Sequence, residues 1–176
     1  SEQFGYEPIR FMMIAAHYRS PINYSVEVIN QSISALERLY NCRDELDFAL
    51  SQAGAEGSDA LQKAADEAKE KFVAALSDDL NTADGIAALF DLCKEINLRL
   101  NGEEPQQKAA LEHAAQIFDE LAGVLGLLYN RKKNEVTPEI QELVDRRQAA
   151  RKAKDFAEAD ALRDQLAAMG VTLKDR

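Results

Sequence analysis

Apolar residues recur at every third or fourth position along most of the first 130 residues, which is the period of α-helices that bury one face. Four segments share this period and are separated by short polar or glycine-containing breaks: residues 25–50, 58–76, 82–100 and 105–128. Because short connections join helices that run antiparallel to their neighbours, the pattern predicts an antiparallel four-helix bundle over residues 25–129.

The starts of these four helices carry N-terminal signals. Ser25, Ser58 and Thr82 each precede an apolar stripe, so we predict that they are N-caps. Pro105 is predicted to start the fourth helix, because a proline in the first turn loses no hydrogen bond.

A leading segment, residues 1–24, precedes the bundle and is predicted to connect it to whatever comes before. It contains one short helix, from Tyr6 to about residue 16, with Pro8 in its first turn. Apolar residues lie nearly all round this helix, so we expect it to be buried between neighbours. These residues are Ile9, Phe11, Met12, Met13 and Ile14.

The chain changes character near Asn130. Residues 130–136 are polar and are predicted to form a linker, and residues 137–176 are predicted to form a small separate unit. A helix is expected to start at Pro138. Asp155 is expected to cap a second helix, in a capping box with the glutamate three residues later.

The end of this unit is expected to depart from the helical pattern. Gly170 suits the end of a helix, and residues 171–173 could form one short strand. The predicted fold class is therefore all-α: a four-helix bundle with a leading connecting helix, plus a small, mostly helical C-terminal unit.

Charge separates the same two parts of the chain, whose overall net charge is −10. Residues 1–130 hold 10 Lys/Arg and 22 Asp/Glu, a net charge of −12, whereas residues 131–176 hold 11 and 9, a net charge of +2. A polyanion is therefore expected to meet the last quarter of the chain rather than the bundle.

Cysteine usage and hydropathy exclude several classes of protein. Cys42 and Cys93 lie in separate helical segments without a signal peptide, so we expect reduced thiols. The sequence contains no CxxC or HxxxH spacing, so nothing in it indicates a metal site. No apolar run approaches the ~18 residues that a membrane span requires. We expect a cytoplasmic protein without membrane contact, and the start at Ser1 rather than Met indicates a processed or truncated chain.

Three motifs, in order along the chain, resemble those of the cysteinyl-tRNA synthetase family. His17-Tyr18-Arg19-Ser20-Pro21 matches its H-Y-R-S-P motif, and Asp78-Asp79-Leu80-Asn81-Thr82 matches its D-D-L-N-T motif. Residues 147–170 match the C-terminal signature R-x-x-A-R-x-x-K-D-F-x-x-A-D-x-x-R-D-x-L-x-x-x-G, which is the most specific of the three. Tyr6, Pro8 and Arg10 resemble a further motif, Y-x-P-x-x-x-R, with the arginine displaced toward the start.

The resemblance implies that this chain is the C-terminal, tRNA-binding region of an enzyme that ligates cysteine to tRNA(Cys) with ATP. The HIGH and KMSKS motifs and the zinc-binding cysteines of that family do not occur in this sequence. The chain alone is therefore expected to be inactive and to hold no cofactor, since ATP and zinc belong to the catalytic domain, its expected partner. The family usually continues past Asp175, so the unit 137–176 is expected to be truncated.

The resemblance also implies which residues meet the tRNA, above all its anticodon loop. Arg147, Arg151 and Lys154 are spaced i, i+4 and i+7, so on a helix they would form a basic stripe that neutralises phosphates. The alternative is a solvated helix face that is balanced by neighbouring acidic residues.

Three further residues of this segment are expected to read the anticodon. Phe156 could stack on an unpaired base, or it could anchor a small core. Asp160 and Asp175 could accept hydrogen bonds from base amino and imino groups. The alternative for Asp160 is an ion pair with Arg163 one turn away, and the alternative for Asp175 is a frayed chain end.

In the leading segment, Arg19 is expected to contact the tRNA backbone. The alternative is a surface turn in which Tyr18 packs against the bundle. Asp78 and Asp79 suit helix capping or packing better than a metal site, and His17 is expected to be structural. Two other functions stay open: a free-standing tRNA-binding paralogue without a catalytic half, and an acidic helical interaction module that binds no RNA.

Overall fold

The computed structural model describes residues 5–131, 138–152 and 155–168 of the chain. These residues form seven helices and no strand. They belong to two compact units, residues 1–131 and residues 132–176. The predicted all-α class is therefore confirmed for the part of the chain that the structure describes.

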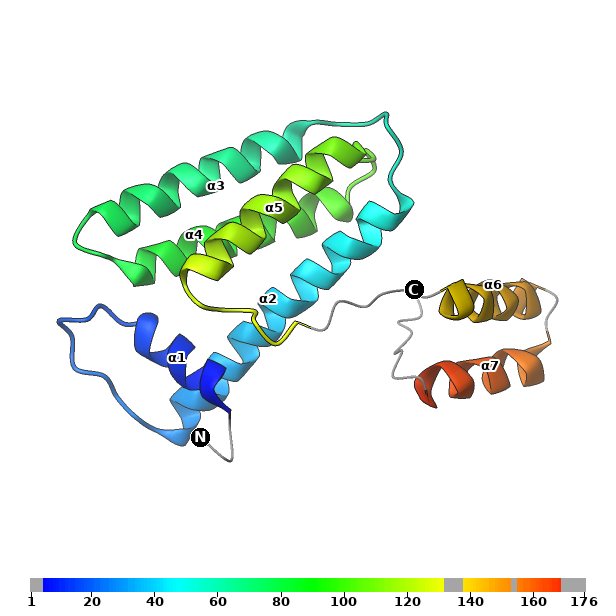
Figure 1. Ribbon diagram of the computed structural model, residues 1–176, viewed down its shortest axis with the longest axis horizontal. Coiled ribbons are helices and arrows are strands. Elements are labelled where there is room, and N and C mark those ends of the chain that lie inside the picture. Colours follow the sequence, from blue (N-terminus) through cyan, green and yellow to red (C-terminus); the bar gives the residue numbers. More distant parts are fainter. Residues whose placement is uncertain (1–4, 132–137, 153–154, 169–176) are drawn as a thin grey trace. The chain divides into compact units, whose positions relative to one another are not determined.

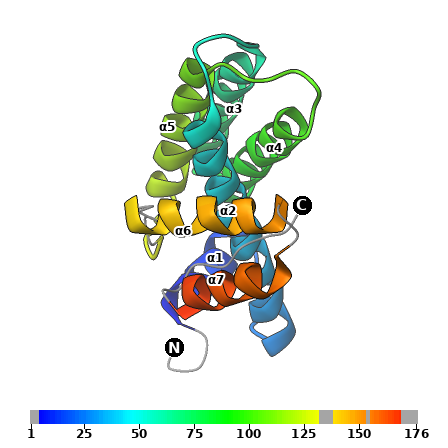
Figure 2. The ribbon, with the colours of Figure 1, turned by 90° about the vertical axis from the view of Figure 1, so that its right-hand side faces the viewer.

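The first unit contains five helices, which are drawn in Figures 1 and 2. They are α1 (Tyr6–Ile14), α2 (Val26–Gln52), α3 (Ala60–Ser77), α4 (Thr82–Leu100) and α5 (Lys108–Val124). Helices α2 to α5 pack around a common core, and α1 lies against α2. This is the predicted four-helix bundle with a leading helix.

The core consists of the apolar stripes that the sequence predicts. Five large residues of these stripes, which come from all four bundle helices, have no or almost no exposed surface: Leu39, Leu61, Leu89, Ile96 and Phe118. Helix α1 differs from its prediction, because only one side of it faces the bundle. Phe11 and Met12 are buried, but the side chain of Met13 is 55 % exposed.

Two predicted N-caps are wrong in detail. The Oδ1 atom of Asn81, not the Thr82 hydroxyl, accepts the Asp84 N–H at 3.1 Å and caps α4. The Thr82 hydroxyl instead donates to the carbonyl of Ile14 at 2.7 Å, so a tertiary contact takes the group that could have capped the helix. Helix α3 begins after Asp59, although the Ser58 hydroxyl still accepts the N–H of Ala60 at 3.3 Å.

The start of α5 is also later than predicted, because backbone pairing holds the residues after Pro105 in an extended form. Ser58 and Gln106 form an isolated parallel bridge, in which the Ser58 N–H donates to the Pro105 carbonyl at 2.8 Å. The Gln107 N–H returns a bond to the Ser58 carbonyl at 3.1 Å. A Cβ atom at Gly57 would lie 2.5 Å from the Pro105 carbonyl oxygen, so the close approach of the two loops requires glycine there.

The second unit is a pair of helices, α6 (Pro138–Lys152) and α7 (Phe156–Ala168). Asp155 caps α7 as predicted, because its Oδ1 atom accepts the Glu158 N–H at 3.1 Å. Small and medium-sized apolar side chains form its described core: Ala150, Ala159, Leu162 and Leu166. Gly170 and the predicted strand at residues 171–173 lie outside the described residues.

Candidate nucleic-acid interface

The basic stripe of the C-terminal unit is described for two of its three members. Both Arg147 and Arg151 lie on α6, where Arg151 is exposed and Arg147 is half-buried. Helix α6 ends at Lys152, and Lys154 lies outside the described residues. Arg146, next to the stripe, forms an ion pair with Glu158 of α7 at 3.2 Å, which links the two helices.

Asp160 is presented on the outer side of α7, and its side chain is 66 % exposed. It forms an i, i+3 ion pair with Arg163 at 3.3 Å, and Arg163 also approaches Asp164 at 3.7 Å. Exposed ion pairs of this kind are weak. The carboxylate of Asp160 is therefore held by a partner that another hydrogen-bond donor could displace.

Two other residues are expected to read the anticodon, Phe156 and Asp175. Phe156 is the first residue of α7, but its side chain lies outside the described part of the chain. Asp175 also lies outside the described residues.

Arg19 is anchored to the bundle through Asp79. Its guanidinium lies 3.0 Å from the Asp79 carboxylate, and the Tyr18 hydroxyl donates to the same carboxylate at 2.7 Å. The Arg19 guanidinium also lies over the Tyr18 ring, 5.3 Å from its centre. The His17 ring stacks on the same Tyr18 ring, with the two ring centres 4.8 Å apart. The hydrogen bond to Asp79 raises the pKa of Tyr18. The half-buried His17 and the exposed Tyr18 and Arg19 thus form one aromatic and cationic group.

This placement shows which of the two expected roles, capping or packing, each aspartate of the D-D-L-N-T motif has. Asp78 ends α3, but Asp79 contacts the leading segment instead of capping a helix. Asp79 and Leu80 have φ angles of 58° and 52°, in the left-handed region that costs a leucine energy. The turn therefore presents Asp79 toward residues 17–19, and no periodic signal in the sequence could have predicted that contact.

A buried carboxylate, which the helical pattern of the sequence does not predict, joins α1 to the end of the bundle. Glu7 is only 5 % exposed and accepts hydrogen bonds from the backbone N–H of Leu128, from the Tyr40 hydroxyl at 2.8 Å and from the Asn130 side chain at 3.4 Å. On the next turn of α1, Arg10 donates to the carbonyl of Gly126 at 2.9 Å. The resemblance to Y-x-P-x-x-x-R was the available signal for this region.

A second cluster fixes Arg131, which the sequence assigns to the linker. Arg131 forms ion pairs with Asp47 of α2 at 2.6 Å and with Asp119 of α5 at 3.1 Å. The same two carboxylates bind Arg43, whose side chain is 7 % exposed. The start of the predicted linker is thus attached to the bundle, because two aspartates on different helices have room for a second arginine.

The two cysteines face each other inside the bundle. Cys42 and Cys93 are both free and buried, as expected, and the Cys42 thiol points at the Cys93 carbonyl at 3.7 Å. The contact with Cys93 and burial both raise the pKa of Cys42. Among the described residues, no group of three or more His, Cys, Asp or Glu side chains could hold a metal ion. None of the described helices has the length and apolar character needed to cross a membrane.

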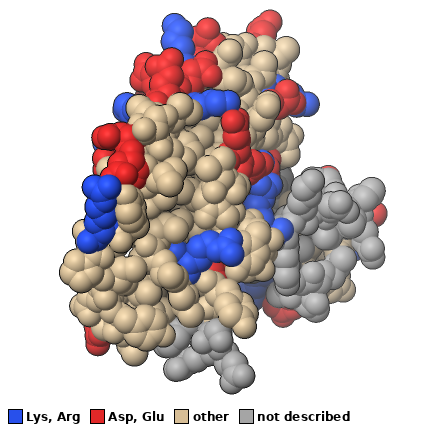
Figure 3. Space-filling view, turned by 60° about the vertical axis from the view of Figure 1, so that its left-hand side comes forward, with Lys and Arg blue, Asp and Glu red and all other residues tan. Residues whose placement is uncertain are grey.

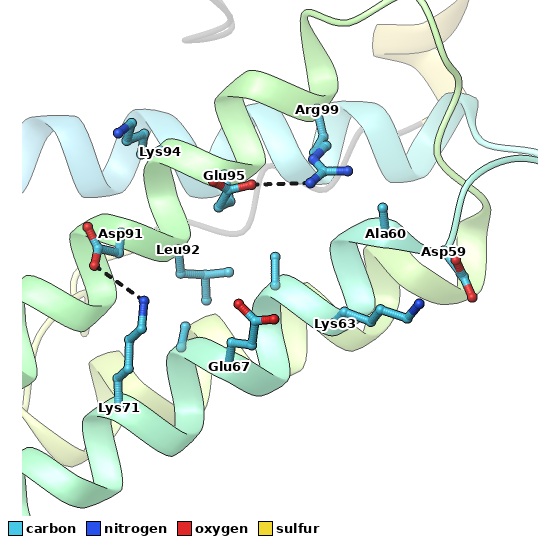
Figure 4. A pocket seen from close by; sticks show the side chains of 12 residues that line it. Asp59, Ala60, Lys63, Glu67, Lys71, Asp91, Leu92, Lys94, Glu95 and Arg99 are labelled. Atoms are coloured by element: carbon cyan, nitrogen blue, oxygen red, sulfur yellow. Dashed lines mark hydrogen bonds and ion pairs between the residues drawn. The ribbon is translucent and has the colours of Figure 1, made fainter.

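The surface of the bundle mixes the two charges. Figure 3 shows Lys and Arg side chains interspersed with Asp and Glu over the upper part of one face, above a largely uncharged lower part. A hollow of about 530 Å³ between α3 and α4 is lined by equal numbers of basic and acidic side chains. Two ion pairs, Lys71–Asp91 at 3.9 Å and Arg99–Glu95 at 3.4 Å, lie along it (Figure 4). This balance gives the hollow no preference for an anion.

Comparisons with known proteins divide the chain at the same place as the structure does. Residues 71–129 match the family described as the DALR domain, and residues 133–176 match the cysteinyl-tRNA ligase anticodon binding domain. The first match spans α4, α5 and part of α3, and the second spans the whole helical pair.

Curated relatives match nearly the whole length of the chain. A cysteine–tRNA ligase of Caldicellulosiruptor saccharolyticus is 41 % identical over 178 residues, which cover 99 % of this chain and 38 % of the relative. Those of Halalkalibacterium halodurans and Clostridioides difficile are 43 % and 38 % identical, over 98 % and 99 % of this chain. The chain spans less than two-fifths of the length of these relatives. With both domain matches in order, the chain belongs to the cysteine–tRNA ligase family and corresponds to its C-terminal part.

Proposed function

We propose that this chain is the tRNA-binding region of a cysteine–tRNA ligase and that its C-terminal unit reads the anticodon of tRNA(Cys). The match of residues 133–176 to an anticodon binding domain carries the proposal. The charge distribution supports it, because the C-terminal part has a net charge of +2 beside a bundle of −12. Ligation of cysteine, with its ATP and zinc, would belong to a catalytic region outside these residues.

Within the C-terminal unit, the proposed roles follow the chemistry of the side chains. Arg151, with Arg147 and Lys154, contacts phosphates of the anticodon loop, and Phe156 stacks on a base. Asp160 and Asp175 accept hydrogen bonds from base edges. Arg19, held by Asp79 beside Tyr18, contacts the tRNA backbone from the other unit.

The phosphate contact is tested by binding of a tRNA(Cys) transcript to the full chain at several salt concentrations. Arg151→Ala should weaken binding for every anticodon and reduce the slope of log K against log salt by about 1. Lys108→Ala is the matched control, since Lys108 is an exposed cation of the bundle and should leave the slope unchanged. A wild-type chain that binds tRNA no better than an unrelated acidic helical protein would refute the proposed function.

Base reading by Asp160 is tested with transcripts that differ only in the anticodon. Asp160→Ala should reduce discrimination between the correct and a changed anticodon by about 1–3 kcal/mol, because the edge acceptor is lost. Asp164→Ala is the control, since Asp164 contacts the same Arg163 from the neighbouring position. Equal effects of the two variants would show that Asp160 acts only through Arg163.

A further inference from the structure

We infer that Glu7, Arg10, Asp47 and Asp119 form a clasp that fixes the exit segment, residues 126–131, at a set position on the bundle. Because of the clasp, the chain leaves the bundle toward the C-terminal unit from a fixed place. These four side chains are therefore positioning residues for a tRNA that contacts both units. This inference rests on the proposed function.

The exit segment has an unusual backbone that the clasp holds in place. Gly126 and Leu128 have φ angles of 66° and 60°. This left-handed conformation is energetically unfavourable for Leu128, because its Cβ atom crowds the backbone. The N–H of Leu128 donates to the carboxylate of Glu7. A buried carboxylate is tolerated only when its hydrogen bonds are made. Glu7 and the turn at Leu128 therefore stabilise each other, and each is unfavourable without the other.

Arg10 closes the first half of the clasp. It donates to the Gly126 carbonyl at 2.9 Å, and its guanidinium lies over the Tyr129 ring at 5.6 Å. A Cβ atom at position 126 would lie 2.3 Å from the Arg10 Nη1 atom. Glycine at this position thus permits both the left-handed turn and the approach of the arginine.

Asp47 and Asp119 close the second half. They come from α2 and α5 and bind Arg131, the last described residue of the bundle unit. The buried Arg43 shares both carboxylates, so the cluster has two positive and two negative charges and pairs all of them. The aspartates are 44 % and 48 % exposed, whereas Arg43 and Arg131 are 7 % and 15 % exposed, so removing one aspartate would leave two largely buried arginines with a single carboxylate between them.

The position of Arg131 matters because the connection to the next helix is short. Helix α6 begins at Pro138, and the six intervening residues can span at most about 25 Å between the anchoring residues. When one unit has bound the tRNA, the other unit meets it at a high effective concentration, and this raises the overall affinity. The effective concentration depends on where the segment that joins the two units begins, which is Arg131. An exit segment released from the bundle would reduce that gain without changing any residue that touches RNA.

The experiment compares two RNAs on the full 176-residue chain: the complete tRNA(Cys) transcript and its isolated anticodon stem-loop. Glu7→Gln should weaken binding of the complete tRNA about tenfold and leave binding of the stem-loop within about twofold, because only the complete tRNA reaches both units. Hydrogen exchange at the Leu128 amide should accelerate in the same variant. A role limited to overall stability would not change the ratio of the two affinities in a folded protein.

Two further variants distinguish the role of the clasp from misfolding and from a loss of binding to both RNAs. Arg131→Met cuts the exit segment from α2 and α5 but leaves Glu7 in place, and it should change the affinity ratio in the same direction. Asp66→Asn is the control, because it removes an interhelical carboxylate contact, with His113 at 2.6 Å, far from the exit segment in sequence. It should leave the ratio unchanged.

The outcomes separate the inference from the proposed function. If the wild-type chain binds neither RNA, the proposed function fails and the clasp has no such role. If the wild-type chain prefers the complete tRNA but Glu7→Gln and Arg131→Met leave that preference intact, the inference alone fails. Equal weakening of both RNAs by these variants would also overturn it.

Discussion

At the scale of single residues, Tyr40 is notable because its partly buried hydroxyl donates to the buried carboxylate of Glu7. Burial raises the pKa of Tyr40 above its ordinary value of 10.0, and the hydrogen bond and the charge of Glu7 act in the same direction. The neutral phenol is therefore favoured in the folded state, and the contact is stronger than that of a neutral pair.

The sign of the pH effect follows from this shift. A raised pKa contributes stability that is fully present below the ordinary pKa and is lost as pH rises through the folded-state value. The free energy of unfolding of the wild-type chain should therefore fall above about pH 10. Tyr40→Phe should lower it by about 1 kcal/mol at neutral pH and make the alkaline decline shallower. Urea unfolding between pH 7 and 11 measures both effects.

Tyr6→Phe is the control for this prediction, since Tyr6 is an exposed tyrosine at the start of α1. Its alkaline decline should match that of the wild type. An unchanged decline in Tyr40→Phe would mean that the hydroxyl of Tyr40 is equally solvated in the folded and unfolded chains.

At the scale of the elements, the turn between α3 and α4 combines several structural roles in five residues. Asp78 ends α3, Asp79 binds the leading segment, Asn81 caps α4 and Thr82 holds the end of α1. Local and tertiary contacts therefore depend on the same turn.

The cap and the tertiary contact of this turn can be separated by substitution. Asn81→Ala should lower the free energy of unfolding by about 1 kcal/mol, which is the usual cost of a lost N-cap. Thr82→Val should lower it by a similar amount through loss of the bond to Ile14, and Thr82→Ser should restore most of it because the hydroxyl remains. Urea unfolding of the three variants measures this, and a Thr82→Ser variant as unstable as Thr82→Val would contradict the role of the hydroxyl.

The same turn shows which helix caps could be predicted from the sequence alone and which could not. Periodicity predicted the four bundle helices, and proline and capping signals predicted the leading helix and the C-terminal pair. The predicted caps at Ser25 and Asp155 are confirmed, because each side chain accepts a backbone N–H three residues later. At residues 81 and 82, two side chains could cap, and only the packed structure shows that the Thr82 hydroxyl is bound to Ile14.

The candidate site divides in the same way. The motif that contains Arg151 and Asp160 could be located from sequence, because it is a continuous run of residues. The contact of Glu7 with Leu128 joins residues 121 positions apart. Such a contact leaves no periodic signal, so the sequence predicts helix up to residue 128 and a linker from residue 130, where the structure ends α5 at Val124 and forms the exit segment.

At the scale of the whole molecule, the two units differ in how much core they have. The bundle unit has a large core drawn from five helices, whereas the described core of the second unit rests on two alanines and two leucines. A unit of 45 residues buries too little apolar surface for high stability alone.

Separate expression of the units should reveal this difference. Residues 1–131 should unfold cooperatively, with a urea midpoint close to that of the bundle in the full chain, because Arg131 and its partners are retained. Residues 132–176 alone should show weak helicity and a broad thermal transition by circular dichroism. Loss of cooperativity in the 1–131 fragment would show that the bundle depends on the second unit.

The bridge between Ser58 and Gln106 has a consequence for how this protein can vary in length. The loops before α3 and before α5 are joined by three backbone hydrogen bonds, the third from the Lys108 N–H to the Gly54 carbonyl at 2.9 Å. Surface loops usually accept extra residues at little cost. Here an insertion in one loop would displace the backbone of the other, so the two loops must change length together, and a tag or a reporter is better placed elsewhere.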